Sequence, residues 1–471
     1  MTHPLIETEA ALLSTFEGQQ AAYLKDTYPS YETRQAQLQA LKRALQDNQD
    51  TIADAINKDF GRRSLNESKL IDVMGCVMDI NHSLKHMRDW MKTSRRKTEL
   101  LFKGNSASVQ YQPKGVVGII VPWNFPVYLA VAPLAAALAA GNRAMIKMSE
   151  STPETTQLLA EIIASVFSPS QVAVVGGEVD MAQYFSSMPW NHLVYTGSTN
   201  VGRLVMQAAA KNLTPVTLEL GGKSPAIVSR QVNLADAARK LAHGKTTNGG
   251  QICIAPDYAL LHASQVEEFI DHVDKAYSAM YANGLDKTDV VNDRQYQRLQ
   301  SVIEDAREKG ADVRVLGQQQ ADGRYIPLTV VNKTSAEMRV LQEELFGPIL
   351  PIVTYETLAD AIDYINKGDR PLALYFFGDN DEEQAEVLKR THSGGVTIND
   401  WGWHAFNHDI PFGGIGASGM GKYHGKEGFL ELSNARSVLK LTKGFPIQLF
   451  HPPYGLIHKK VFRMFLGEPR K

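Results

Sequence analysis

The chain has 471 residues, 44% of them hydrophobic, and its 49 basic and 51 acidic side chains give a formal charge of −2 at neutral pH. A chain of this length has room for two or three domains, each with a core of its own. A charge so close to zero creates no field that would attract nucleic acid or an anionic membrane, so small neutral molecules are the expected partners.

The cysteines and the two ends of the chain favour a cytoplasmic protein. Cys76 and Cys253 lie far apart in the sequence, so we expect a reducing compartment and no disulfide framework. The first residues do not combine basic side chains with an apolar core, so no secretory signal is expected. The C-terminal stretch LIHKKVFRMFLGEPRK is basic and partly amphipathic. It predicts a helix docked on the protein itself, with contact to a membrane surface as the alternative and no stable membrane insertion.

The first hundred residues are predicted to be mostly helical, because apolar residues recur in them at helical spacing. Two such series are Leu38, Leu41, Leu45, Ile52 and Ile56, and Leu70, Val73, Val77, Ile80, Leu84, Met87 and Met91. The longest apolar stretch, PVYLAVAPLAAALAAG (126–141), is too short to span a bilayer and predicts a buried helix.

From residue 115 onward, short β-rich runs alternate with helical stretches, which indicates parallel sheets. The first series is GVVGIIVP, NRAMIKMS, QVAVVGG, HLVYTGS and VTLELGG, and one of its helices should begin at Thr152 and Pro153, an N-cap followed by a proline. The second series, after Gly222, is DYALLHA, IPLTVVN, PILPIVTYE, LALYFFG and GVTIND.

We therefore predict an α/β protein with two doubly wound parallel-sheet domains. The first comprises residues 1–97 and 114–219, and the second comprises residues 220–400. Residues 98–113 and 425–442 look like strands that belong to neither sheet. Strands left without a partner often pair with another subunit, so these two segments predict a small β oligomerisation element.

The segment YTGSTNVG (195–202) places Gly197 and Ser198 after a strand and Gly202 in the following helix. Backbone N–H groups and the positive helix end would then face a pyrophosphate, although a tight strand-to-helix turn explains the same residues. GIGASG (414–419) also matches the pattern G-x-G-x-x-G. We reject it as a dinucleotide fingerprint, because it lacks a preceding strand, a following helix and an acidic residue about twenty positions later.

Three residues are candidates for chemistry, and each has a structural alternative. Cys253 in NGGQICI (248–254) follows two glycines, so a substrate can approach the sulfur closely, but a buried inert cysteine is the commoner case. Glu219 ends a strand among leucines and is either paired structurally or tuned as a general base. Asn124 follows a strand and precedes a helix; capping that helix is favoured over donation to an oxyanion.

Two pairs of histidines have metal-like spacing, His82 with His86 and His404 with His408. A protein metal site needs at least a third ligand, and neither pair has one nearby in the sequence or an H-E-x-x-H arrangement. No metal site is therefore predicted.

Six motifs together resemble the aldehyde dehydrogenases, in the same order and at similar spacing over nearly the whole chain. They are PWNFP, YTGSTNVG, TLELGGKSP, NGGQICIAPDY, EELFGP and PFGGIGASGMGKYHG. CIAPDY and SGMGKYHG are similar to the class 3 branch. QAAYLKDTYPSYETR and HPPYG are most similar to the coniferyl aldehyde dehydrogenases of that branch.

The resemblance implies a role for each candidate. Cys253 would be the nucleophile and Glu219 the base, and Asn124 and the Cys253 backbone N–H would hold the oxyanion. The first domain would bind a dinucleotide and the second would be catalytic. Lys147 and Glu150 would contact the adenosine ribose, Ser198 the pyrophosphate, and Glu344 and Phe346 the nicotinamide ribose and ring. The other positions expected at the cofactor are Trp123, Gly197, Gly202 and Leu220. Met148 departs from the frequent proline and Ala417 from the frequent asparagine.

The implied reaction oxidises an aldehyde to a carboxylic acid through a cysteine thiohemiacetal and thioester. NAD is the expected cofactor, because Glu150 would repel the 2′-phosphate of NADP, which is the alternative. Trp401, Trp403 and Phe406 favour aromatic, coniferyl-type aldehydes or medium-chain apolar ones, although core packing explains some of these rings equally well. Class 3 relatives suggest a homodimer. The alternative functions are a CoA-acylating aldehyde dehydrogenase and a non-catalytic binding protein with this fold.

Overall fold

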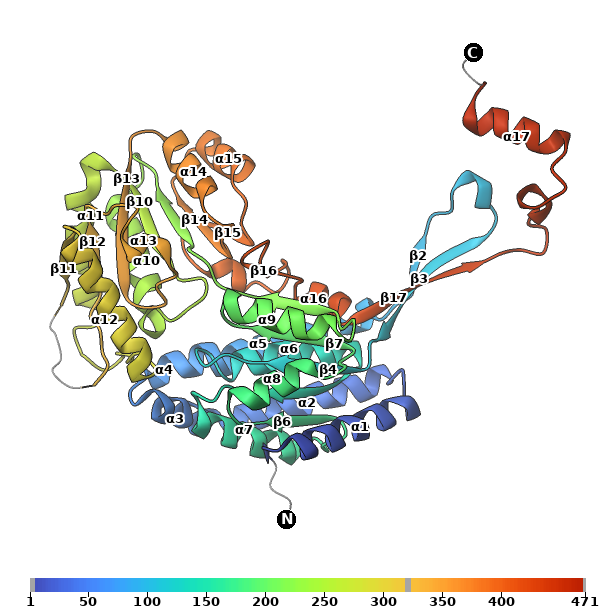
Figure 1. The fold of residues 1–471 in the computed structure, drawn as a ribbon, viewed down its shortest axis with the longest axis horizontal. Helices are drawn as coiled ribbons and strands as arrows, with labels where there is room; N and C mark the ends of the chain where they lie inside the picture. The colour runs from blue at the N-terminus through green and yellow to red at the C-terminus, as the bar shows by residue number, and fades with distance from the viewer. Residues whose placement is uncertain (1–4, 318–322, 469–471) are drawn as a thin grey trace.

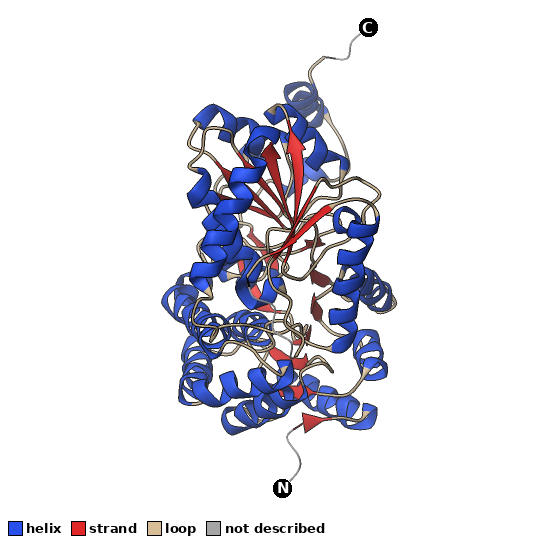
Figure 2. Ribbon diagram, turned by 90° about the vertical axis from the view of Figure 1, so that its left-hand side faces the viewer, coloured by secondary structure: helices blue, strands red, loops and turns tan. Residues whose placement is uncertain are grey.

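The structure is a computed structural model that describes residues 5–317 and 323–468. It contains two sheets of seven strands and a third, antiparallel sheet of three strands. Helices cover both faces of each large sheet (Figure 2), as expected for doubly wound α/β domains. The predicted fold class is therefore confirmed.

The first large sheet has the strand order β1-β6-β5-β4-β7-β8-β16, and every pair is parallel except β8 with β16. All five predicted runs of the first series contain strands of this sheet, and these strands form its centre, β6-β5-β4-β7-β8. Its strands are β1 (Leu5–Ile6), β4 (Val116–Ile120), β5 (Arg143–Lys147), β6 (Val172–Val175), β7 (His192–Thr196), β8 (Val216–Glu219) and β16 (Gly419–Met420).

The second large sheet has the order β11-β12-β13-β10-β9-β14-β15 and is parallel except for the edge pair β11 with β12. All five predicted runs of the second series form strands in it. Its strands are β9 (Pro225–Val228), β10 (Tyr258–His262), β11 (Asp312–Val315), β12 (Thr329–Asn332), β13 (Ile349–Tyr355), β14 (Ala373–Phe377) and β15 (Gly395–Ile398).

The helices fill the chain between the strands, and five of them precede the first long strand, as the spacing of apolar residues predicted. They are α1 (Glu9–Lys25), α2 (Tyr31–Asp47), α3 (Gln49–Phe60), α4 (Leu65–Ser68), α5 (Gly75–Trp90), α6 (Tyr128–Ala140), α7 (Pro153–Val166), α8 (Val179–Ser187), α9 (Thr199–Ala210), α10 (Leu234–Thr246), α11 (Val266–Met280), α12 (Asp293–Glu308), α13 (Arg339–Gln342), α14 (Leu358–Lys367), α15 (Asp381–Arg390), α16 (Gly425–Glu431) and α17 (Leu456–Leu466).

Helix α6 corresponds to the longest apolar stretch, and all of its residues are buried. It lies beside β4 and β5 in the core of the first domain. Burial on every face explains why its sequence is apolar all round rather than amphipathic. None of the described helices combines the length and the apolar composition needed to cross a bilayer.

The third sheet joins β17 (Ser433–Lys440), β3 (Ser106–Pro113) and β2 (Ser94–Arg96), and it projects away from the two domains (Figure 1). The strand prediction for residues 425–442 is wrong in its first part, because Gly425–Glu431 is helix α16. Phe429 of this helix packs against Trp90 in the core, so an exposed strand is excluded there. Strand β2 lies before the predicted segment 98–113.

The basic C-terminal tail forms α17 as predicted, but the helix does not dock its apolar side chains on the protein. It lies beyond the third sheet, far from the two domains (Figure 1). Its exposed apolar residues are Leu456, Ile457, Phe462, Met464, Phe465 and Leu466. The expectation of a self-docked helix is therefore wrong, because nothing else in the described chain covers this face.

Candidate active site

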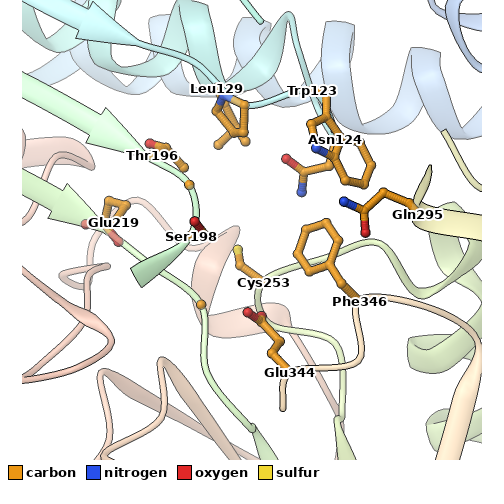
Figure 3. Close-up of a pocket in the computed structure, with 13 residues that line it drawn as sticks. Trp123, Asn124, Leu129, Thr196, Ser198, Glu219, Cys253, Gln295, Glu344 and Phe346 are labelled. Carbon is orange, nitrogen blue, oxygen red and sulfur yellow. The ribbon is translucent and has the colours of Figure 1, made fainter. Parts of the chain in front are cut away.

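A cavity of about 210 Å³ opens where the carboxyl ends of β7 and β8 face the loop that carries Cys253 (Figure 3). Clefts at the carboxyl ends of parallel strands are the usual ligand sites of such sheets. Eight predicted site residues line it, namely Trp123, Asn124, Gly197, Ser198, Glu219, Cys253, Glu344 and Phe346. Five lining residues were not predicted: Pro122, Leu129, Thr196, Gly221 and Gln295.

The loop before Cys253 owes its path to the two glycines of NGGQICI. Asn248, Gly249 and Gly250 have φ values of 50°, 59° and 73°, a left-handed run that glycine adopts most easily. A Cβ on Gly250 would lie 2.5 Å from the carbonyl oxygen of Gly347, so any side chain is excluded there. The Asn248 amide, held in this unusual conformation, donates to the Glu67 carboxylate at 2.9 Å.

Gln251 anchors the same loop from inside. Its side chain is fully buried, and its amide donates to the carbonyl oxygens of Asn248 at 2.9 Å and Asp289 at 3.1 Å. Its Oε1 accepts from the Val291 amide at 3.0 Å. A polar residue is therefore required at position 251 because it fixes the nucleophile loop to the segment around Asp289.

Cys253 lies at the floor of the cavity, with its sulfur pointing into it (Figure 3). Both cysteines are free, as predicted; Cys76 is buried, whereas Cys253 is partly exposed. Burial raises the pKa of the Cys253 thiol to about 12, with further increases from the Glu344 and Glu219 carboxylates, while the Cys253 and Ile254 backbone amides act in the opposite direction. The resting group is thus the neutral thiol, and its attack on a carbon must be coupled to loss of a proton.

Asn124 points toward the same space (Figure 3), and helix capping is not its role. Its side-chain amide donates to the Gln251 carbonyl oxygen at 3.1 Å, and its carbonyl oxygen accepts from Asn248 at 3.1 Å. The N-cap residue of the following helix α6 is Val127, and Asn124 makes no hydrogen bond to the first turn of that helix. An amide has two N–H donors, so the second one of Asn124 is available to an oxygen near the Cys253 sulfur.

A buried ion pair that sequence reasoning missed holds the Asn124 loop. Asp72, on a π-helical turn before α5, accepts from the amides of Val127 and Tyr128, both at 3.1 Å, and so caps α6. Arg63 donates to Asp72 at 3.0 Å and to the Asn124 carbonyl oxygen at 2.6 Å, and both charged side chains are fully buried. No local signal in the sequence connects this ion pair with the Asn124 loop or α6, because those contacts span more than fifty positions.

Glu219 ends β8 and is 3% exposed. Neither of its carboxyl oxygens has a hydrogen-bond partner within the described chain, so the structural-pairing alternative is excluded for these residues. Burial raises the pKa of Glu219 well above its usual value; Lys422 acts in the opposite direction and Glu431 in the same one. A carboxyl group with a raised pKa keeps its proton to a higher pH than usual, and it becomes a base when it loses that proton.

The segment PFGGIGASGMG closes the site around Glu219. A Cβ on Gly413 would lie 2.8 Å from a Glu219 carboxyl oxygen, so glycine makes room for the acid. Strand β16 in this segment pairs antiparallel with β8, with Gly419 opposite Glu219. GIGASG is therefore a structural turn, and its rejection as a dinucleotide fingerprint agrees with the fold.

Glu344 and Phe346 reach the cavity from the loop before β13. The Glu344 carboxylate lies against Gly221, where a Cβ would be 2.2 Å from a carboxyl oxygen. Burial and then Asp257 raise the pKa of Glu344 to about 8. Phe346 has a positive φ of 50° and packs edge to face on Trp123 with ring centroids 5.3 Å apart, so both rings form one wall.

The turn after β7 supports only part of the predicted phosphate site. Ser198 caps α9 by accepting from the Val201 amide at 3.4 Å, and the amides of the first helical turn have no partner within the helix. The Gly202 amide instead donates to the Ser198 carbonyl oxygen at 2.9 Å, so it does not face a ligand. Gly202 and Leu220 have a packing role, because a Cβ on Gly202 would lie 2.7 Å from Leu220.

Lys147 and Glu150 lie outside the cavity, at the carboxyl end of β5. The Lys147 ammonium is buried and donates to the carbonyl oxygens of Met148 at 2.7 Å and Gly177 at 2.8 Å. Burial lowers the pKa of Lys147, and the exposed Glu150 is the first of the carboxylates that raise it. The two residues thus share one edge of the sheet, on the same side as Ser198.

A second, apolar pocket of about 60 Å³ reaches Cys253 from the other side. Its lining is Ile71, Phe125, Tyr128, Leu129, Ile252, Cys253, Ile254, Trp401, Ala405, Phe406, Phe412, Tyr423 and His424. Phe406 also borders an outer hollow of about 530 Å³, together with Trp403. We refer to these two spaces as the tunnel and its mouth. Trp401 lines the tunnel and also packs in the core, where a Cβ on Gly244 would lie 2.7 Å from its ring.

A thiol that shares one cavity with an amide and two carboxyl groups, and that also borders an apolar tunnel, suits an enzyme that attacks an apolar substrate with sulfur. Residues 17–438 match the family model described as "Aldehyde dehydrogenase family". The chain belongs to the aldehyde dehydrogenase family, and the resemblance found in its motifs is confirmed.

Known relatives cover nearly the whole chain. A protein of Pseudomonas aeruginosa named "Probable coniferyl aldehyde dehydrogenase" is 48% identical over 97% of this chain and 96% of its own length. The substrate-bound structure of Staphylococcus aureus AldH has 34% identity and a TM-score of 0.91, covering 96% of this chain and 99% of that one. An aldehyde dehydrogenase of Mycobacterium tuberculosis complexed with NAD+ has 29% identity and a TM-score of 0.84, with coverage of 92% and 91%.

Proposed function

We propose that this protein oxidises an aldehyde to a carboxylic acid through a thioester on Cys253, with NAD as the hydride acceptor. The observation that carries the proposal is the shared cavity: one thiol, one amide donor and one unpaired buried carboxyl group line it together. The carboxyl group favours hydrolysis over transfer to CoA, because water must be activated to cleave a thioester near neutral pH.

The residues present fit a dinucleotide. The first turn of α9, directly after Gly197, leaves backbone donors at the cleft, and a further cavity of about 620 Å³ extends from Ser198 and Arg203 past Lys223. Trp123 and Phe346 would border the nicotinamide, Glu344 its ribose, and Lys147 with Glu150 the adenosine ribose. Bound NAD would accept the hydride that leaves the substrate carbon. Glu150, which would repel a 2′-phosphate, supports NAD over NADP.

The chain's own groups perform the remaining steps. The Cys253 sulfur adds to the aldehyde carbon, and the thiol proton passes to solvent water. The free N–H of Asn124 and the Cys253 backbone amide hold the resulting oxyanion, a charge that is absent in the bound aldehyde. After the hydride has left, Glu219 takes a proton from water, which attacks the thioester and releases the acid.

Asn124→Ala is expected to lower kcat by roughly 10²- to 10³-fold, because it removes an oxyanion donor whose interaction forms only after sulfur addition. Steady-state NADH formation measures the effect. The rate of Cys253 alkylation by iodoacetamide serves as the control, since it shows whether the nucleophile loop keeps its position without the bond to Gln251. An unchanged kcat would remove Asn124 from the oxyanion site.

We further propose aromatic aldehydes of the coniferyl type as substrates. Aromatic rings dominate the tunnel, namely Phe125, Tyr128, Trp401, Phe406, Phe412 and Tyr423, and they suit a flat apolar substrate. The name of the Pseudomonas aeruginosa relative supports the same class. Trp403 is 57% exposed at the mouth, so it contributes less to substrate binding than the sequence alone suggested.

His424 is the polar exception in this lining. Its ring is buried, and neither ring nitrogen has a hydrogen-bond partner of normal geometry among the described residues. Burial and then His408 lower the pKa of His424 to about 3, against a contribution from the Ala405 backbone. The imidazole is therefore neutral, with one N–H donor and one acceptor nitrogen. We propose that it binds the phenolic hydroxyl of the substrate.

Two aldehydes that differ only in this hydroxyl test the proposal. 4-Hydroxycinnamaldehyde should have a kcat/KM at least about tenfold above that of cinnamaldehyde, and His424→Phe should remove the difference. Phe412→Leu is the matched control, because Phe412 stacks on His424 at 4.9 Å without a polar atom and should affect both aldehydes alike. Preference for short polar semialdehydes would contradict the substrate class, and an unchanged ratio in His424→Phe would contradict the role of the imidazole.

A cytoplasmic homodimer is the assembly that we propose. β17 is an edge strand of the projecting sheet, and most of its residues are exposed, so it can pair with a second copy. The exposed apolar face of α17 lies beyond the same sheet (Figure 1). Light scattering of the full chain should give twice the chain mass of 52.1 kDa, and a stable monomer would contradict the proposal.

A further inference from the structure

Two histidines stand at the mouth of the tunnel, one turn apart on α5. The rings of His82 and His86 lie 4.6 Å apart, and Trp90 packs against both, at 5.7 Å and 6.1 Å. Residues at positions i and i+4 share one face of a helix, and two such imidazoles can bind one metal ion. Trp90 limits the freedom of both rings, so less side-chain conformational entropy is lost when an ion binds.

The structure supplies the third ligand that the sequence does not reveal. Asp409, on the segment after Phe406, lies 3.9 Å from His82 Nε2. One ligand atom each from His82, His86 and Asp409 lie within 4.8 Å of one another, and no other such trio occurs in the described ranges 5–317 and 323–468. The sequence did not reveal this third ligand, because Asp409 is more than three hundred residues away from His82 and His86 in the chain.

We propose that His82, His86 and Asp409 form a binding site for a divalent transition ion of the Zn²⁺ type. Two imidazole nitrogens and one carboxylate suit Zn²⁺, whereas Mg²⁺ and Ca²⁺ require mostly oxygen ligands. Three protein ligands leave the fourth tetrahedral position to water. The Asp409 side chain is 77% exposed, so a small rotation brings its carboxylate to bonding distance without disturbing the core.

Bound metal would connect two walls of the mouth. His82 belongs to α5 of the first domain, whereas Asp409 belongs to the segment that also contributes Trp403, Phe406 and His408 to the hollow. His408 stacks on His82 at 5.7 Å and continues toward His424 at 5.9 Å, so the site is contiguous with the tunnel. Fixing Asp409 to α5 narrows the entry for bulky aldehydes. This consequence, unlike the metal site itself, rests on the proposed function.

The site is tested by calorimetric titration of Zn²⁺ into metal-free Cys253→Ala protein, a background in which the active-site thiol cannot bind the ion. One ion per chain is expected. His86→Ala and Asp409→Asn should each weaken the affinity at least about tenfold. His272→Ala is the matched control. His272, on α11, is likewise a partly exposed histidine beside a carboxylate, Glu268, but among the described residues it belongs to no group of three possible metal ligands. Melting curves confirm that all variants fold.

Binding that is absent, or that survives both His86→Ala and Asp409→Asn, would overturn the site. The effect of bound Zn²⁺ on the entry of aldehydes is measured separately. This experiment uses protein that retains Cys253, loaded with Zn²⁺ and then freed of the excess ion. The KM for a cinnamaldehyde should rise more than that for propanal, and Asp409→Asn should lose this difference. Equal effects on both aldehydes would overturn the narrowing of the mouth. An inactive unloaded enzyme would contradict the proposed function instead, and it would leave the titration result valid.

Discussion

Cys253→Ala is expected to abolish aldehyde oxidation, with kcat lower by at least about 10⁴-fold. The aldehyde carbon cannot release hydride until sulfur adds to it and its oxygen carries negative charge. No other described residue can take over this step, because Cys76 is fully buried and its pKa is well above the usual value. The measurement is NADH formation with 4-hydroxycinnamaldehyde at saturating cofactor.

The chain offers a matched control for this loss, since it has only two cysteines. Cys76→Ala removes a thiol from the core of the first domain and should keep most of the activity. Thermal melting of Cys253→Ala should stay close to that of the unsubstituted protein, because Cys253 lies at the edge of the core and is partly exposed in the cavity. Turnover by Cys253→Ala above one hundredth of the normal rate would show that another group attacks the substrate.

Glu219→Gln is expected to separate the two halves of the reaction. The variant should form one equivalent of NADH per site in a burst and then turn over roughly 10²- to 10⁴-fold more slowly, because general-base activation of water is lost. Rapid mixing that follows NADH absorbance measures both phases. Full steady-state activity would remove Glu219 as the base.

The pH dependence of hydrolysis follows from the raised pKa of Glu219. A carboxyl group with a raised pKa is protonated at lower pH and becomes a base only as the pH rises, so the hydrolytic rate should increase with pH and lose this dependence in Glu219→Gln. Glu344→Gln is the necessary comparison, because Glu344 has a pKa of about 8 and also raises the pKa of the Cys253 thiol. If Glu344→Gln stalls after a burst and Glu219→Gln does not, the two roles must be exchanged.

Local sequence was sufficient for most of the fold. Short β-rich runs located most strands of both large sheets, which are buried on both faces, and helical spacing of apolar residues located the helices before them. Local sequence did not predict the elements whose conformation depends on tertiary contacts. Gly425–Glu431 is helical because Phe429 enters the core, and the two-residue strand β16 exists only because β8 lies beside it.

The site shows the same division. Gly250, Gln251 and Cys253 are close in the chain, and their pattern indicated a cysteine whose sulfur a substrate can approach closely. The role of Asn124 was misjudged from local sequence, because the residue that caps α6 is Asp72, more than fifty positions away. Gly202 fits the pattern of a phosphate-binding turn in the local sequence. Its packing against Leu220 is not visible there, because Leu220 follows a different strand. Asp409 and His82 are brought together only by the folded chain.

The central claim is that the substrate carbon becomes bonded to the Cys253 sulfur before water releases it. Intact-protein mass spectrometry of Glu219→Gln, quenched in acid after the NADH burst, tests it most directly. The protein mass should rise by that of the aldehyde less two hydrogens, and peptide mapping should place the added group on Cys253. An unmodified protein after a full burst, or an adduct at another residue, would contradict this mechanism.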